Sequence, residues 1–170
     1  MRSESVLLVP VHGLPPLIEE LRRQHDPSAR AGVPAHITVL YPFVEPQRLT
    51  VDTFSELDRL LNRWAACDYA LTEVREFEKG VLYLAPEPAK PFIELTTMVG
   101  DRFDLLPFGG TFPTVVPHLT VMQSADEADR ERITSLLRRA LPQSARASEA
   151  WVMVGDNDSD WTTVHTTKFR

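Results

Sequence analysis

The sequence predicts a single α+β domain that extends over residues 1–170. Strand-like segments rich in β-branched residues alternate along the chain with helix-like segments that repeat apolar residues every three to four positions. Neither a linker nor a low-complexity segment interrupts this pattern. A chain of 170 residues is also long enough to bury one substantial core.

The first half of the chain contains four such segments. Residues 6–11 are an apolar run closed by prolines and predict a buried strand, and residues 15–25 begin with proline and predict a helix. Residues 35–43 alternate between apolar and polar side chains and predict a strand. Residues 52–64 carry apolar side chains at helical spacing and predict a helix whose cap is Asp52 or Thr53.

The second half continues in the same style. It first predicts two strands, at residues 69–77 and 81–85, joined by a turn at 78–80. A helix at 90–103, a loop at 106–113, a strand at 115–123 and a helix at 125–141 follow. The chain closes with strands at 148–154 and 161–169, joined by a turn at 155–158.

The composition is that of an ordinary globular protein, with 43% hydrophobic and 25% charged residues. No apolar run approaches the ~18 residues of a membrane span, and the N-terminal apolar stretch is too short for a signal peptide. The single cysteine, Cys67, excludes an internal disulfide, and its flanks predict packing at a helix end. We therefore expect a cytoplasmic protein without a membrane partner.

The formal net charge of −6 indicates which partners to expect. A protein that grips long nucleic acid needs a positive field that neutralises several phosphates, so the charge argues against DNA as a partner. A small positive pocket on an acidic body is still compatible with a nucleotide or an RNA end. We expect the chain to act as a monomer.

Two segments of the chain resemble each other. The sequence Val33-Pro-Ala-His36-Ile-Thr38-Val-Leu40 is echoed by Val115-Val-Pro-His118-Leu-Thr120-Val-Met122. In both, a proline precedes a histidine, an aliphatic residue and a threonine follow, and a helix-like stretch comes next. This echo predicts a duplicated unit, with two lobes that face each other across a pseudo-twofold axis.

The chemistry of the repeated triplet explains its use. Side chains alternate along a strand, so His36 and Thr38 project from one face, as do His118 and Thr120. Histidine titrates near neutral pH, so one imidazole can accept a proton while the other donates one. Threonine hydroxyls can donate hydrogen bonds to phosphate oxygens. The four residues predict a phosphodiester site with His36 and His118 as acid and base and with Thr38 and Thr120 as phosphate ligands.

Other interpretations of these residues remain open. Each triplet taken alone is compatible with a structural pair on a strand, and a third triplet, His165-Thr166-Thr167, lacks the proline and the aliphatic residue and is interpreted as coincidental. A zinc site built from His36, His118 and His165 is a weaker alternative without typical ligand spacing, so we expect no metal and no cofactor. A non-catalytic module that binds nucleotides or RNA ends is the main alternative to an enzyme.

Two phenylalanines near the motifs are candidates for stacking on a base. Phe43 follows the first motif strand, and Phe108 lies in the Gly-containing loop before the second motif. A cleft that binds a nucleotide needs such an aromatic surface. Packing in the core is the alternative for each ring.

The paired motifs resemble those of the two-histidine (2H) phosphoesterases, in particular the 2′-5′ RNA ligase-like branch. The resemblance extends over nearly the whole chain and implies a bilobal α+β fold, with two antiparallel sheets and flanking helices around a central cleft. It also implies a metal-independent phosphodiesterase that opens 2′,3′-cyclic phosphates or related cyclic phosphodiesters of nucleotides or RNA ends. Some members join RNA ends by a 2′-5′ linkage. By motif, His36 and His118 are the acid–base pair, and Thr38 and Thr120 hold the phosphate.

Overall fold

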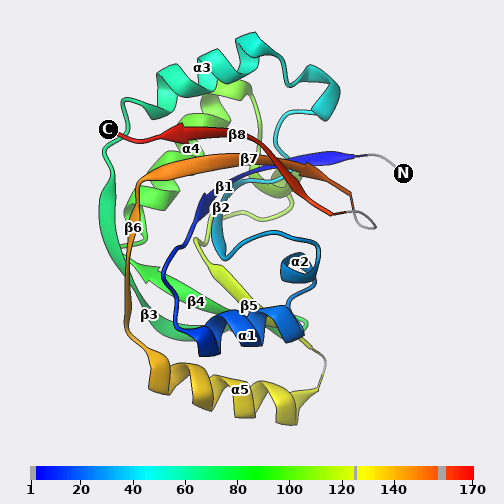
Figure 1. Ribbon diagram of the computed structural model, residues 1–170, viewed down its shortest axis with the longest axis vertical. Helices are drawn as coiled ribbons and strands as arrows, with labels where there is room; N and C mark the ends of the chain where they lie inside the picture. The colour runs from blue at the N-terminus through cyan, green and yellow to red at the C-terminus, as the bar shows by residue number, and fades with distance from the viewer. Residues whose placement is uncertain (1–2, 125, 157–159) are drawn as a thin grey trace.

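Two four-stranded antiparallel sheets form the framework of the protein, for which we have a computed structural model (Figure 1). The structure describes residues 3–124, 126–156 and 160–170. The strands of the first sheet lie in the order β2 (His36–Leu40), β1 (Glu4–Pro10), β7 (Glu149–Gly155) and β8 (Thr162–Lys168). The strands of the second lie in the order β5 (Leu119–Gln123), β4 (Val81–Glu87), β3 (Cys67–Phe77) and β6 (Gln143–Ala147). The α+β prediction is confirmed.

Helices flank both sheets. The α-helices are α1 (Pro16–His25), α2 (Pro27–Arg30), α3 (Val51–Leu61), α4 (Lys90–Phe103) and α5 (Glu127–Ala140), and two 3₁₀ helices span Pro46–Arg48 and Pro107–Gly110. The helices α3 and α4 pack against the first sheet, whereas α1 and α5 pack against the second (Figure 1). No helix among the described residues is both long and apolar enough to cross a bilayer.

The topology is a duplicated strand–helix–strand unit. The first unit is β1–α1–β2 and the second is β4–α4–β5, and each places its motif strand at the edge of a sheet. The helix of each unit packs against the motif strand of the other unit, α1 against β5 and α4 against β2. The strands β2 and β5 also contact each other, so the topology brings the two echoed segments together.

One apolar core joins the two sheets. Its buried residues come from both, and Leu7, Ile37, Leu84 and Leu119 are fully buried. A smaller cluster that contains Leu8 and Met153 lies on the other side of the first sheet, next to Trp151 and Trp161. Side chains on β1 are therefore buried on both faces, which explains why its residues 6–10 are all apolar.

Several boundaries differ from the sequence-based predictions. The strand predicted at residues 115–123 begins only at Leu119, and the helix predicted at 52–64 spans Val51–Leu61. Its cap is Thr50, whose hydroxyl accepts a bond from the Thr53 backbone N–H, and not Asp52 or Thr53.

The structure also corrects one local prediction and adds elements that were missed. Cys67 is the half-buried first residue of β3, so the helix end predicted there is wrong. The strand β6 and helix α2 were not predicted. Ala125, at the start of the helix predicted over 125–141, and part of the turn predicted at 155–158 lie outside the described residues.

Candidate active site

The four motif residues lie at the facing edges of the two sheets. His36 and Thr38 are on β2, opposite Pro10 and Leu8 of β1, while Thr120 is on β5, opposite Tyr83 of β4. His118 directly precedes β5. All four motif side chains are half-buried, whereas the intervening Ile37 and Leu119 are fully buried. The predicted alternation is therefore confirmed: aliphatic residues anchor each strand, and the polar pair faces away from the core.

Both imidazoles are fixed by the same backbone contact. The Nδ1 atom of His36 lies 2.8 Å from the carbonyl oxygen of Pro34, and Nδ1 of His118 lies 2.7 Å from that of Val116. A carbonyl oxygen only accepts, so Nδ1 carries the proton that it donates. In the neutral tautomer that this bond selects, Nε2 of each ring has a free lone pair. Each ring is thus oriented to exchange a proton through Nε2.

Burial shifts both histidines toward the neutral form. It lowers the pKa of His36 to about 4, and it also lowers the pKa of His118. The Pro34 carbonyl opposes this shift at His36, while the positive charges of Arg22 and His118 add to it. The contact between β2 and β5 agrees with the effect of His118 on the pKa of His36, and the two histidines lie at neighbouring strand edges.

The threonine hydroxyls are available for a ligand. Among the described residues, neither Thr38 nor Thr120 has a side-chain hydrogen bond. A half-buried hydroxyl without a partner on the protein can donate to an anion without first breaking another bond.

Two aromatic rings, Phe77 and Tyr83, pack against His118, and the sequence analysis did not identify them. The rings of Phe77 and Tyr83 stack with centroids 4.1 Å apart, and both meet the His118 ring edge-on, at 4.9 and 5.6 Å. Tyr83 is the register partner of Thr120, so the pairing of β4 with β5 brings it there. A one-residue register shift within this pair could not be foreseen from the sequence, which left these rings unassigned.

The two candidate stacking residues have different environments. Phe43 is only 4% exposed and packs edge-on against Phe103, so the core-packing alternative is the one that the structure supports for it. Phe108 is 36% exposed, and its ring contacts Tyr41, the residue after β2, and Phe112. The Phe108 backbone N–H also donates to the Tyr41 carbonyl, at 2.7 Å. The loop that leads into the second motif therefore lies beside the first motif and presents an exposed ring.

His165, the histidine of the third triplet and of the zinc alternative, lies away from the other two. His165 is on β8, at the edge of the first sheet opposite β2, where its Nε2 lies 2.8 Å from Asp58 Oδ1 and its ring stacks on Phe54. The fold thus separates it from His36, as expected if the third triplet is coincidental. Within the described ranges, no group of three potential metal ligands is found.

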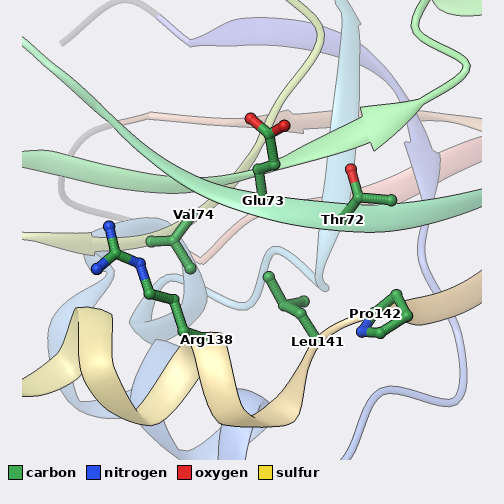
Figure 2. Close-up of a pocket in the computed structure, with 6 residues that line it drawn as sticks. All are labelled: Thr72, Glu73, Val74, Arg138, Leu141 and Pro142. Carbon is green, nitrogen blue, oxygen red and sulfur yellow. The ribbon is translucent and has the colours of Figure 1, made fainter.

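A hollow of about 360 Å³ between β3 and α5 is separate from the motif residues (Figure 2). Its lining residues are Thr72, Glu73, Val74, Arg138, Leu141 and Pro142. Figure 2 shows Arg138 and Glu73 on opposing elements, but the Glu73 carboxylate is already paired with Arg75, at 2.7 Å. No histidine or cysteine is among the residues that line this hollow, so we do not assign acid–base or nucleophilic chemistry to it.

Two antiparallel sheets with paired His–Thr edges define an α+β protein of the two-histidine phosphoesterase type. The sequence profile of the 2′-5′ RNA ligase superfamily matches residues 9–159, and the chain belongs to this superfamily.

Solved structures show the same fold at low sequence identity. Escherichia coli LigT in its apo form is 18% identical, with a TM-score of 0.59 and coverage of 99% of both chains. LigT in complex with 3′-AMP is 16% identical, with a TM-score of 0.58 and the same coverage. The protein TT0787 of Thermus thermophilus is 16% identical, with a TM-score of 0.59 and coverage of 99% of this chain and 97% of that one. No curated protein matches the sequence.

Proposed function

We propose that this protein is a metal-independent phosphodiesterase that opens a 2′,3′-cyclic phosphate, or a related cyclic phosphodiester, of a nucleotide or RNA end. The observation that carries the proposal is the matched anchoring of two imidazoles, each donating through Nδ1 to a carbonyl two residues earlier and each leaving Nε2 free. The superfamily and its phosphoesterase members support an enzyme. A LigT structure that contains 3′-AMP supports a nucleotide as the ligand.

The two histidines divide the proton transfers between them. We assign His36 as the general base, because its pKa of about 4 keeps it neutral and ready to accept a proton from water. The water oxygen attacks phosphorus, the bond to the ribose 2′ or 3′ oxygen breaks, and His118 donates its proton to the departing oxygen. The product is a nucleoside monophosphate. The step leaves His36 protonated and His118 neutral, and proton exchange with solvent returns both rings to their starting protonation states.

Substrate binding prepares this division of roles. A phosphodiester carries one negative charge, and a negative charge beside an imidazole favours its protonated form. Binding therefore raises the pKa of both rings, and we assign the proton to His118 because its pKa, unlike that of His36, is not lowered further by a neighbouring arginine. Hydrogen bonds from Thr38 and Thr120 hold the two non-bridging oxygens and align the attacking water with the leaving oxygen.

Phe108 is the candidate surface for the base. Its ring is partly exposed and borders the residue that follows the first motif strand. A base that stacks on it would lie beside Tyr41, at the end of the first motif strand. We propose that the protein acts in this way as a monomeric, single bilobal domain in the cytoplasm, with RNA ends or nucleotides and not DNA as its substrates.

The test is turnover by purified protein of 2′,3′-cyclic nucleotides, RNA ends with a cyclic phosphate, and 2′-5′-linked dinucleotides, with and without a chelator. We expect hydrolysis of at least one cyclic phosphate at a rate that the chelator leaves unchanged. Formation of a 2′-5′ linkage from RNA ends would extend the function to ligation. Tight binding with the ligand recovered intact would instead favour the non-catalytic binding module.

A further inference from the structure

A buried arginine on α1 contacts both halves of the candidate site. Arg22 is 2% exposed, although it is a charged residue on an otherwise amphipathic helix. Its Nε–H donates to the backbone carbonyl of Thr120, at 3.2 Å. One of its terminal nitrogens, Nη2, lies 3.4 Å from the carbonyl of Val33 and donates to it. One guanidinium therefore connects β5 with the segment that leads into β2.

The two carbonyls that Arg22 holds belong to the catalytic motifs. Thr120 supplies one of the hydroxyls that we assign to the phosphate. Val33 directly precedes Pro34, whose own carbonyl orients the ring of His36. A movement of either peptide would therefore shift a group that touches the substrate.

The charge of Arg22 is balanced inside the protein. Asp26, one turn later on the chain and 1% exposed, accepts from Arg22 Nη2 at 2.9 Å. The Asp26 carboxylate also accepts a hydrogen bond from the Ser28 backbone N–H, at 3.0 Å, and another from the Ser28 hydroxyl. Through the first of these bonds Asp26 caps the N-terminus of α2. Apolar residues of similar volume often replace a buried ion pair without loss of stability, so stability alone does not account for this pair.

The choice of arginine is consistent with a geometric role. Its planar guanidinium donates in several fixed directions, whereas a lysine ammonium is a single point of charge at the end of a flexible stem. The corresponding helix of the second unit, α4, makes a simpler contact: the Thr96 hydroxyl donates to the Val39 carbonyl of β2, at 3.0 Å. Only the α1 contact of these two therefore joins both halves of the site, because the Arg22 side chain reaches both β5 and the segment before β2.

We propose that Arg22 is a positioning residue that holds the two His–Thr pairs at a fixed separation around the phosphate. This proposal rests on the proposed function, because it concerns the geometry of that same site. Displacing a reacting group by about 1 Å can reduce a rate by about 10²-fold, so the carbonyl contacts bear directly on turnover.

The test compares Arg22→Lys with Arg23→Lys. The second variant is the matched control, because Arg23 is the neighbouring residue of α1 and forms an exposed ion pair with Glu20. With a 2′,3′-cyclic nucleotide as substrate, we expect Arg22→Lys to lower kcat by about 10- to 100-fold with KM within about twofold of wild type. Arg23→Lys should leave both constants unchanged. Wild-type kcat in Arg22→Lys would overturn the proposal.

Imidazole NMR spectra provide a readout that does not depend on turnover. We expect the signals of both His36 and His118 to shift in Arg22→Lys and neither to shift in Arg23→Lys. If only one histidine responds, Arg22 does not join the two halves and the proposal fails. If wild-type protein turns over no cyclic phosphate, the proposed function fails, while the NMR comparison still decides the role of Arg22.

A second variant protects the test against loss of folding. In Arg22→Met/Asp26→Asn the buried charges are removed together, so no unpaired ion is left in the core. We expect this variant to melt cooperatively and to show the same fall in kcat and the same shift of both histidine signals. A cooperative fold with wild-type kcat and unchanged signals would reduce the ion pair to a structural feature.

Discussion

The two half-sites, His36 with Thr38 and His118 with Thr120, hold their imidazoles by the same backbone contact but differ in their surroundings. His36 lies near a buried ion pair, Arg22 and Asp26, whose charges act on its pKa in opposite directions. His118 lies against the rings of Phe77 and Tyr83, and burial and a backbone carbonyl are the causes that act on its pKa. The two units thus anchor their imidazoles in the same way, but the neighbours of the two rings differ. Separating the pKa values of paired groups is the way in which one site obtains both an acid and a base.

The largest expected effect comes from removing either imidazole. We expect His36→Ala and His118→Ala each to reduce kcat/KM on a cyclic phosphate by about 10²- to 10⁴-fold. On bis(4-nitrophenyl) phosphate, whose leaving group needs little protonation, His118→Ala should retain most activity and His36→Ala should not. Steady-state kinetics on both substrates measure this difference. The reverse pattern would exchange the two roles.

Removing one threonine hydroxyl should have a smaller effect. Hydrogen bonds to a charged group contribute about 1.5–3 kcal/mol, so Thr38→Val or Thr120→Val should reduce kcat/KM by about 10- to 100-fold. Valine keeps the branched shape that suits a strand, and thermal melting should therefore be nearly unchanged. A markedly unequal response of the two variants would show that one half-site dominates phosphate binding.

The pH dependence should reveal the inequality of the two rings. Activity of the free enzyme rises as pH exceeds the pKa of the base and falls as pH exceeds the pKa of the acid. Because burial lowers the pKa of His36 to about 4 and also lowers the pKa of His118 from its ordinary value of 6.5, kcat/KM should be greatest above about pH 4 and should fall before pH reaches 6.5. An optimum above about pH 7, beyond the ordinary range of an imidazole, would contradict the assignment of His118 as the acid.

The smallest expected effect concerns the aromatic loop. Phe108→Ala should raise KM for a cyclic nucleotide by about 5- to 100-fold, since stacking on a base contributes about 1–3 kcal/mol, with little change in kcat. Phe43→Leu is the control: it should lower the melting temperature because Phe43 is in the core, and it should leave KM unchanged. An unchanged KM in Phe108→Ala would move the base elsewhere.

The sequence was sufficient for what depends on local pattern. The α+β class, most strands and helices, and the alternation around both histidines follow from residue spacing, and the structure confirms them. It could not indicate Arg22 or Tyr83, because their contacts with the second motif come from helix packing and strand register. The cap at Thr50 was missed because Asp52 and Thr53 are equally good capping residue types, and only the backbone conformation distinguishes them.

The way in which the chain passes between the two sheets has a final consequence. After the first unit the chain leaves its own sheet as β3 and pairs with β4, and after β6 it returns as β7 to pair with β1. A unit separated from the other could not complete a four-stranded sheet. Its edge strands would then expose unpaired backbone N–H and C=O groups. Proteolytic nicking at the 78–80 turn would therefore yield fragments that regain a paired-histidine site only by reassociating.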